Sequence, residues 1–368
     1  MRSQLEPTLP AFSGGCITNL LPYLLPRGRG MARLPVELGA TKKRVLLVLD
    51  GVGWDQLQDR QSIVPTLHAM TGGPITTVAP STTATALTSI TTSLTPAEHG
   101  VVGYRMVVDG EVLNTLRWGS LETPDARRQI PPDVIQPYDP FHGQDVPLVS
   151  RADFRRSGFS AAHLRGAHLV GYRTTATLVH EVSRLLHEGE EFVYAYYDGI
   201  DKVSHEYGFG SVFDAEFAFV DRLVAEIIAS VPSGTEVIVT ADHGQVDCGN
   251  NVVHLHEDVD ALVTGMSGEG RFRWLHCDPA AIDELESEAK HHHGHQAWVR
   301  TRQQILDENW FGPVMRHGVE DRLGDVALCP FEPISFFDPA DSGPYELIGR
   351  HGSLTDAEML VPLLRAEA

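Results

Sequence analysis

The sequence predicts an α/β fold in which a mainly parallel sheet lies between helices. The clearest sign is residues 45–49, five consecutive apolar residues without the alternation that a half-exposed strand shows. Continuous apolar runs are typical of strands covered on both faces. Residues 192–197 and 236–240 are two more predicted strands. All three end on polar residues, and parallel sheets place their chemistry beyond such strand ends.

The composition is that of an ordinary globular enzyme with a strong negative charge. The 368 residues, 42% of them hydrophobic, suffice for one large α/β domain or two medium ones. A formal charge of −20 disfavours nucleic acid polymers and anionic membranes as partners. If the substrate is an anion, a strong local positive charge must oppose this field, and bound divalent cations are its natural source.

No stretch approaches the roughly 20 apolar residues that span a bilayer, and the N-terminus lacks the pattern of a signal peptide. We therefore expect a soluble, cytoplasmic protein. The four cysteines are scattered without a CxxC pair, which argues against a disulfide framework and a structural zinc site. Free buried thiols are expected.

The chain divides into three predicted parts. Residues 1–43 are predicted to be a lead-in segment lying on the domain, and residues 44–368 to form a single domain. Within it the pattern changes at 245–323, which predicts an inserted or capping region between core segments 44–244 and 324–368. A terminal helix is expected within 355–364.

The first strand stops on Asp50, followed by Gly51 and Gly53. A carboxylate at this position is a candidate metal ligand, and the glycines let the backbone turn close to an ion or a phosphate. The alternative is that Asp50 caps the helix predicted near Trp54.

Three consecutive hydroxyl residues, Ser81, Thr82 and Thr83, lie where a helix is predicted to start. One interpretation is N-capping, which Ser and Thr favour. The other is a nucleophile, because the free N–H groups and positive dipole end of a helix favour a bound phosphate. Both hold if different residues take the two roles.

Two further pairs follow the other strands. Asp201 and His205 are four residues apart, so on a helix they share a face and can hold one ion, although a surface ion pair is the alternative. Asp242 and His243 follow residues 236–240, and at an irregular strand end both can turn toward one metal. The tract at 291–295, with four histidines, has no carboxylate or strand to fix it and is expected to be a solvated loop.

These candidates form one set of seven residues at strand ends or helix starts. The set divides into two metal sites, one of four residues and one of three. The first contains Asp50, Thr83, Asp242 and His243; the second contains Asp201, His205 and His351. Mixed oxygen and nitrogen ligands suit catalytic zinc, and manganese accepts them too. Two neighbouring ions can clamp both sides of a phosphoryl transfer.

In the order of these candidate residues along the chain, the sequence resembles the alkaline phosphatase superfamily, and within it the type I phosphodiesterase/nucleotide pyrophosphatase family. The resemblance runs from about residue 45 to 364. Its ordered signatures are Leu49-Asp50-Gly51, Pro80-Ser-Thr-Thr83, Glu98-His99-Gly100, Asp201-Lys-Val-Ser-His205, Asp242-His243-Gly244 and Arg350-His351-Gly352.

The resemblance implies an alkaline-phosphatase-like core with a smaller capping region, and a metal-dependent hydrolase with two zinc ions. Thr83 corresponds to the family's threonine nucleophile, and a threonine there disfavours a sulfatase. The implied substrate is a small phosphorylated molecule, either a nucleotide or a phosphodiester.

The sequence departs from the family at two positions. Tyr104 stands where the family's phosphodiesterases often have an Asn that contacts a phosphoryl oxygen, so Tyr104 or Arg105 is expected to substitute for it. Ser204 replaces the usual glycine before the metal-binding histidine.

Two alternatives to a phosphodiesterase stay open at this point. One is a phosphomonoesterase or phosphotransferase on the same scaffold, because fold and metals do not choose the acceptor. The other is a non-catalytic, metal-stabilised protein that binds a phosphorylated ligand. The intact Thr83 argues against the second. The sequence predicts no particular oligomeric state.

Overall fold

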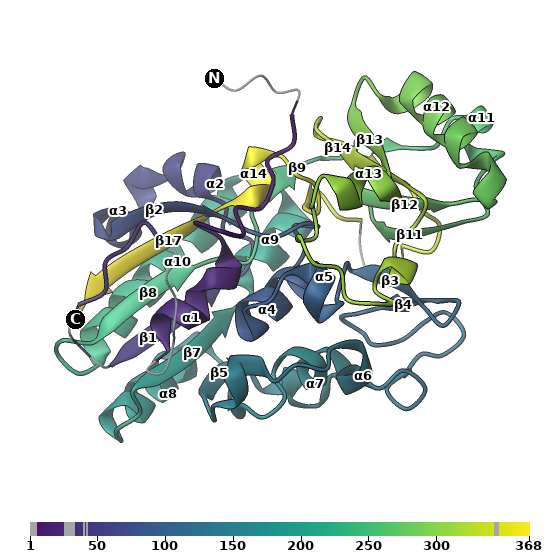
Figure 1. The fold of residues 1–368 in the computed structure, drawn as a ribbon. Coiled ribbons are helices and arrows are strands. Elements are labelled where there is room, and N and C mark those ends of the chain that lie inside the picture. The colour runs from purple at the N-terminus through teal and green to yellow at the C-terminus, as the bar shows by residue number, and fades with distance from the viewer. Residues whose placement is uncertain (1–5, 26–33, 40, 42, 342–345) are drawn as a thin grey trace.

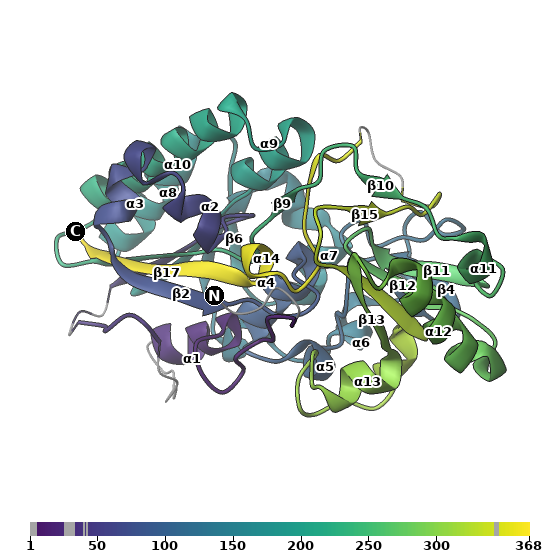
Figure 2. The same ribbon diagram turned by 90° about the horizontal axis from the view of Figure 1, so that it is seen from above.

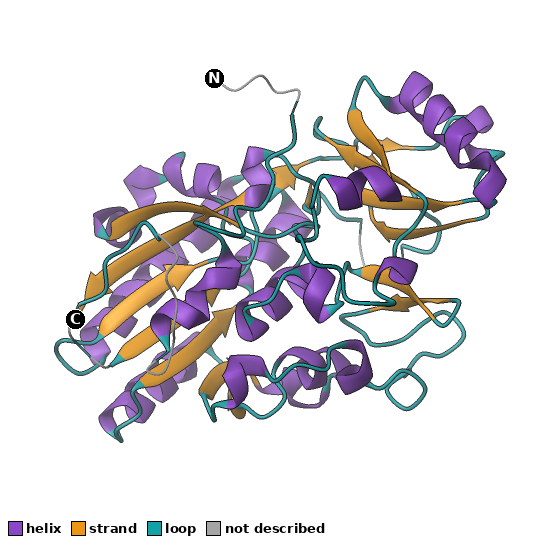
Figure 3. Cartoon of the chain, in the orientation of Figure 1, coloured by secondary structure: helices purple, strands orange, loops and turns teal. Residues whose placement is uncertain are grey.

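A seven-stranded sheet forms the centre of the structure (Figures 1 and 3). This computed structural model describes residues 6–25, 34–39, 41, 43–341 and 346–368. The strands lie in the order β2 (Thr71–Thr76), β17 (Leu360–Glu367), β8 (Glu236–Thr240), β1 (Arg44–Leu49), β7 (Phe192–Tyr197), β5 (Pro147–Arg151) and β6 (His168–Tyr172). Only β17 runs against its neighbours in this sheet. The predicted, mainly parallel α/β sheet is confirmed.

Strand β1 is the middle strand, and its register fixes where the site forms. Val48 lies opposite Thr240 of β8 on one side and Tyr196 of β7 on the other. Because these three strands are parallel and end level with one another, the residues that follow them emerge at one edge of the sheet.

Helices cover both faces of this sheet, as the view from above shows (Figure 2). One layer contains α2 (Trp54–Gln58), α3 (Pro65–Ala69), α8 (Thr175–His187), α9 (Gly199–Tyr207) and α10 (Ser211–Ser230). The other contains α1 (Leu20–Leu24), α4 (Thr83–Thr92), α5 (Pro96–His99), α6 (Pro132–Ile135) and α7 (Gly158–His163). None of the helices in the described ranges is long and apolar enough to cross a membrane. All four cysteines are buried free thiols, as predicted.

The described part of the lead-in segment belongs to the main core. Cys16 and Ile17 are fully buried, and a bridge joins Cys16 to Thr76 at the end of β2. The segment therefore covers the sheet instead of lying loosely on it.

A small lobe with its own antiparallel sheet lies to one side of the central sheet (Figure 1). Its strands lie in the order β11 (Gly265–Glu269), β12 (Phe272–His276), β14 (Val326–Pro330) and β13 (Ala297–Thr301). Its helices are α11 (Glu257–Asp260), α12 (Ile282–His293) and α13 (Arg302–Asp307). Three two-stranded pairings surround it: β3 (Arg105–Val108) with β4 (Glu111–Asn114), β10 (Val252–Val253) with β15 (Ser335–Phe336), and β9 (Val246–Asp247) with β16 (Gly349–Arg350).

The predicted return to the core at residue 324 is wrong. Strand β14 pairs with β12 and β13, so it belongs to the small lobe. Val326 and Leu328 face the lobe's core, whereas Ala327 and Cys329 join the main core. The apolar run of β14 suits any strand that is covered on both faces, and its sequence alone does not show with which strands it pairs.

The predicted terminal helix is also wrong for most of its length. Helix α14 (Asp356–Met359) is one short turn, and the chain continues as β17 between β2 and β8. Pro362 explains the change, because inside a helix its ring would clash with the preceding turn.

One buried ion pair joins the small lobe to α14. Arg271, between β11 and β12, donates from Nε to Glu358 Oε1 at 2.7 Å and from Nη2 to Oε2 at 2.8 Å, and both side chains are fully buried. Burial opposes the charge, but Glu358 outweighs it and raises the pKa of Arg271 above its usual value. Glu358 also accepts from Ser353 N and Thr355 Oγ1. The carboxylate therefore holds the lobe, α14 and the loop before it together.

We predict that Glu358→Gln lowers the free energy of unfolding by about 3 to 5 kcal/mol, because it leaves a buried guanidinium without its counter-charge. Denaturant unfolding measures the change. The matched control is Glu188→Gln, which removes an exposed partner of Arg184 and should leave the midpoint unchanged. Equal midpoints for Glu358→Gln and the wild type would contradict the prediction.

Candidate active site

Carboxylates from three adjacent strands meet at one edge of the central sheet. Asp50 follows β1 directly, Asp242 lies two residues beyond β8, and Asp201 lies in the first turn of α9 after β7. All three are at least largely buried. The sheet order β8, β1, β7 thus brings together residues that are distant in sequence.

The first predicted metal set is assembled around His243. Its Nε2 lies 3.4 Å from Asp50 Oδ1, 3.5 Å from Asp242 Oδ2 and 3.1 Å from Thr83 Oγ1. Donor atoms about 2.0–2.1 Å from a tetrahedral ion lie about 3.3–3.4 Å apart, so these separations suit one shared ion.

The second predicted set is assembled around Asp201. Its Oδ1 lies 3.2 Å from His205 Nε2 and 3.8 Å from His351 Nε2. The rings of His243 and His351 stack with centroids 3.7 Å apart, so the two sets adjoin. The structure therefore brings all seven predicted residues together in the same two groups.

The three histidines share one orientation. In each ring Nδ1 faces a backbone carbonyl: Gly349 O at 2.6 Å for His205, Gly244 O at 3.1 Å for His243, and Ser81 O at 2.9 Å for His351. A carbonyl only accepts, so each Nδ1 carries a proton, and Nε2 is the nitrogen that can bind an ion. All three Nε2 atoms lie beside the carboxylate cluster.

The electrostatics of the cluster call for cations. Burial, followed by the charges of Asp242 and Asp201, raises the pKa of Asp50 well above its ordinary value. Burial also raises the pKa of Asp242. Asp50 Oδ1 and Asp242 Oδ2 are buried and accept no hydrogen bond from the described part of the chain. Unpaired buried carboxylate oxygens are costly, and divalent ions would satisfy them. The donor set therefore fits two divalent metal ions.

Sequence reasoning missed the residues that hold these ligands. Tyr196 donates its hydroxyl to Asp50 Oδ2, and Gln245 Nε2 donates to Asp201 Oδ1 at 2.8 Å. Ser204 donates to Gln245 Oε1, which gives the departure from glycine at 204 a supporting role. Gln245 directly follows Asp242-His243-Gly244, which is the one local signal that could have identified it.

Gly51 is required by this close packing. Its φ of +77° disfavours other residues, and a Cβ there would lie 2.2 Å from Gln245 Nε2. The predicted turn after Asp50 thus leaves room for the residues that hold Asp201.

Thr83 is the first residue of α4, and Thr82 occupies the N-cap position without a side-chain cap. Ser81 instead donates to Ser353 O at 2.7 Å, joining this turn to the loop after His351. The predicted hydroxyl cap is therefore wrong. Thr83 stands at the start of a ten-residue helix with its hydroxyl toward His243.

The two predicted substrate contacts differ in their surroundings. Arg105 is buried and donates to Asp338 at 2.6 Å and Asp341 at 2.9 Å, so two carboxylates already neutralise its charge. Arg105 as a phosphoryl contact stays a prediction. Tyr104 is half-buried, and its neighbour Gly103 lies near Pro80, before the Thr83 turn. Tyr104 as a phosphoryl contact stays a prediction.

The small lobe contributes Glu269, at the end of β11, which the sequence did not reveal. Its Oε2 lies 4.0 Å from His351 Nδ1, and burial raises its pKa well above the ordinary value. A Cβ at Gly352 would lie 2.9 Å from Glu269 Cδ, so the glycine after His351 allows this approach.

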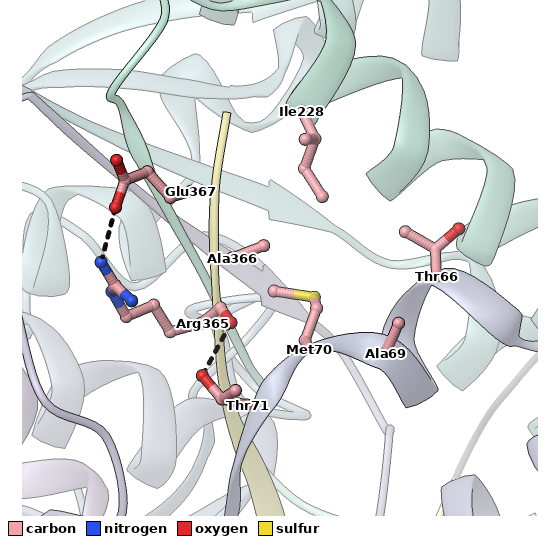
Figure 4. A pocket seen from close by; sticks show the side chains of 8 residues that line it. All are labelled: Thr66, Ala69, Met70, Thr71, Ile228, Arg365, Ala366 and Glu367. Atoms are coloured by element: carbon pink, nitrogen blue, oxygen red, sulfur yellow. Dashed lines mark hydrogen bonds and ion pairs between the residues drawn. The ribbon is translucent and has the colours of Figure 1, made fainter.

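A separate pocket lies at the opposite edge of the sheet (Figure 4). It is lined by residues of α3, β2, α10 and β17, including Met70, Ile228 and Arg365. Arg365 is paired with Glu236 and Glu367, which leaves no free charge for an anion. The cluster at the carboxyl ends of the strands is therefore the candidate active site.

Comparisons with known proteins show the family of this chain. The sequence model described as Type I phosphodiesterase / nucleotide pyrophosphatase matches residues 44–175 and 112–354, most of the chain. No match was found among curated proteins.

Solved structures show the same fold. Murine ectonucleotide pyrophosphatase / phosphodiesterase 5 is 17% identical with a TM-score of 0.63, covering 88% of this chain and 87% of its own. The human protein is 16% identical with a TM-score of 0.64 over the same shares. Phosphonoacetate hydrolase from Sinorhizobium meliloti 1021 is 19% identical with a TM-score of 0.63, covering 92% and 91%. Because the family model covers most of the chain, the chain belongs to the type I phosphodiesterase/nucleotide pyrophosphatase family of phosphoric ester hydrolases.

Proposed function

We propose that the protein is a two-metal phosphodiesterase or nucleotide pyrophosphatase with Thr83 as its nucleophile. The observation that carries this proposal is the common orientation of His205, His243 and His351, whose Nε2 lone pairs adjoin buried carboxylates. The Thr83 hydroxyl lies at the same centre, 3.1 Å from His243 Nε2. A structural metal site would have no use for a hydroxyl at a helix start.

The residues that would hold the ions are Asp50, Thr83, Asp242 and His243 for one, and Asp201, His205 and His351 for the other. When bound, two divalent ions, Zn²⁺ before Mn²⁺, would supply the positive charge that lowers the pKa of a coordinated hydroxyl and neutralises developing negative charge. They would also offset, near the site, the negative potential that the net charge of −20 creates and that repels an anionic substrate.

The chain's own residues perform the covalent step. Thr83 Oγ1 loses its proton to water and attacks phosphorus, the bond from phosphorus to the leaving oxygen breaks as the new one forms, and the leaving oxygen departs as an anion that takes up a proton from water. The N-terminus of α4 favours the negative phosphoryl group with its free N–H groups and dipole. Water then attacks the phosphothreonine, which releases the phosphoryl product and restores the hydroxyl.

The relatives support a small phosphorylated substrate. An inactive threonine-to-alanine variant of the murine protein was solved in complex with AMP, and phosphonoacetate hydrolase in complex with phosphonoacetate. We therefore propose a nucleotide or another small phosphodiester as the substrate class. The cytoplasmic location stays a prediction.

Replacing the nucleophile tests the assignment directly. Thr83→Ala should lower turnover by a factor on the order of 10⁴ or more while keeping its bound metal, because the hydroxyl is one weak ligand among several. Steady-state kinetics and metal analysis of the same preparation measure both. Thr82→Ala is the matched control and should stay active. A dead Thr82→Ala beside a normal Thr83→Ala would show that the nucleophile is the neighbouring residue.

Metal removal should abolish activity, and Zn²⁺ or Mn²⁺ should restore it, because the three carboxylates repel one another and the substrate without cations. Asp242→Asn and His351→Gln should each lose bound metal as well as turnover. Full activity of the folded protein after exhaustive chelation would rule out the two-metal proposal.

Phosphodiesters should be cleaved faster than matched phosphate monoesters, by about 100-fold in kcat/KM. A monoester dianion needs an additional donor, and loss of one donor at developing charge costs a factor of about 10²–10³. Arg105 cannot supply it without leaving Asp338 and Asp341. p-Nitrophenyl mono- and diesters measured on one preparation give the ratio, and a preference for the monoester would favour a phosphomonoesterase.

A further inference from the structure

The histidine tract at 291–295 is not the solvated loop that the sequence predicts. His291, His292 and His293 form the last turn of α12, and the tract's members have different surroundings. His293 is buried and accepts a hydrogen bond at 3.2 Å from His256 N–H, at the start of α11. His291 and His295 are exposed. His292 turns toward α11.

His256, Asp258 and His292 form a cluster between the two helices, which we call the α11–α12 cluster. Asp258 Oδ2 lies 3.3 Å from His256 Nδ1 and 3.3 Å from His292 Nε2. The two imidazole rings stack with centroids 3.6 Å apart. One carboxylate oxygen is thus equidistant from two imidazole nitrogens.

These separations match the edges of a metal coordination sphere. Donors bound at about 2.0–2.1 Å in a tetrahedral site lie about 3.3–3.4 Å apart. His256 Nδ1 carries a lone pair that accepts a long hydrogen bond, 3.3 Å from Asp258 N, and a bound ion would take the place of this hydrogen bond. Glu288, one turn before His292, lies 3.4 Å from His292 Nε2 and adds a further negative charge.

The helices that carry these residues are held together beneath the cluster. Val259 of α11 and Leu285 and Ala289 of α12 are fully buried in the same core of the small lobe. Figures 1 and 2 both show α11 and α12 side by side at the outer end of this lobe. The packing of the two helices therefore fixes the positions of the three side chains, and part of each side chain is open to solvent.

We propose that the α11–α12 cluster is a Zn²⁺ site, separate from the candidate active site. His256, Asp258 and His292 supply two nitrogen ligands and one oxygen ligand, and water completes the coordination. Imidazole nitrogen favours zinc and copper over magnesium or manganese. The bound ion joins α11 to the end of α12 and so stabilises the small lobe, because an ion that binds only the folded lobe favours folding.

The test counts zinc in the full-length protein after dialysis against Zn²⁺. His292→Gln and Asp258→Asn should each bind one ion fewer than the wild type and keep its activity on a diester. The matched control is His295→Gln, which changes an exposed histidine of the same tract and should leave the count unchanged. Zinc should also raise the Tm of the wild type more than that of His292→Gln. Equal zinc counts in wild type and His292→Gln would overturn the proposal.

A second variant distinguishes failure of the α11–α12 zinc site from failure of the proposed two-metal active site. Asp242→Asn should lose metal from the candidate active site, and His292→Gln in that background should lose one ion more. If Asp242→Asn keeps the full count while His292→Gln loses one ion, the α11–α12 site stands and the two-metal active site fails.

Discussion

Concentrated negative charge is the constraint around which this structure is organised. Asp50, Asp201 and Asp242 are brought together at the ends of three central strands. Burial and the neighbouring carboxylates raise the pKa of Asp50, burial raises the pKa of Asp242, and the facing histidines outweigh burial and lower the pKa of Asp201. Asp50 Oδ1 and Asp242 Oδ2 accept no hydrogen bond from described residues. Divalent cations bound at this centre would relieve the repulsion between its carboxylates.

The parts of the fold that were predicted correctly are those fixed by local pattern. Residues 45–49 are apolar throughout because β1 has strands on both sides and helices on both faces. Asp50, Asp242 and the Asp201–His205 pair were found because strand ends and helix spacing are visible in sequence. Tyr196 was missed because its role depends on a contact with the neighbouring strand, which no local pattern encodes, whereas Gln245 carried one local signal, its place directly after Gly244.

The wrong predictions share a cause. Residues 326–330 and 360–367 are apolar enough to suit several positions, and only their strand partners show that one belongs to the small lobe and the other to the central sheet. The two carboxylates that pair with Arg105, Asp338 and Asp341, likewise lie far from it in sequence. In each case the partner that decides the role is distant along the chain.

The small lobe leaves the core just after His243 and returns just before His351, two residues whose rings stack at 3.7 Å. Its entry and exit are therefore fixed by neighbouring residues of one centre, while its outer end is free to differ. The inner part of the lobe is tied to this centre by Glu269 beside His351 and by the Arg271–Glu358 pair, so only its outer end can change in length or sequence without moving the predicted ligands.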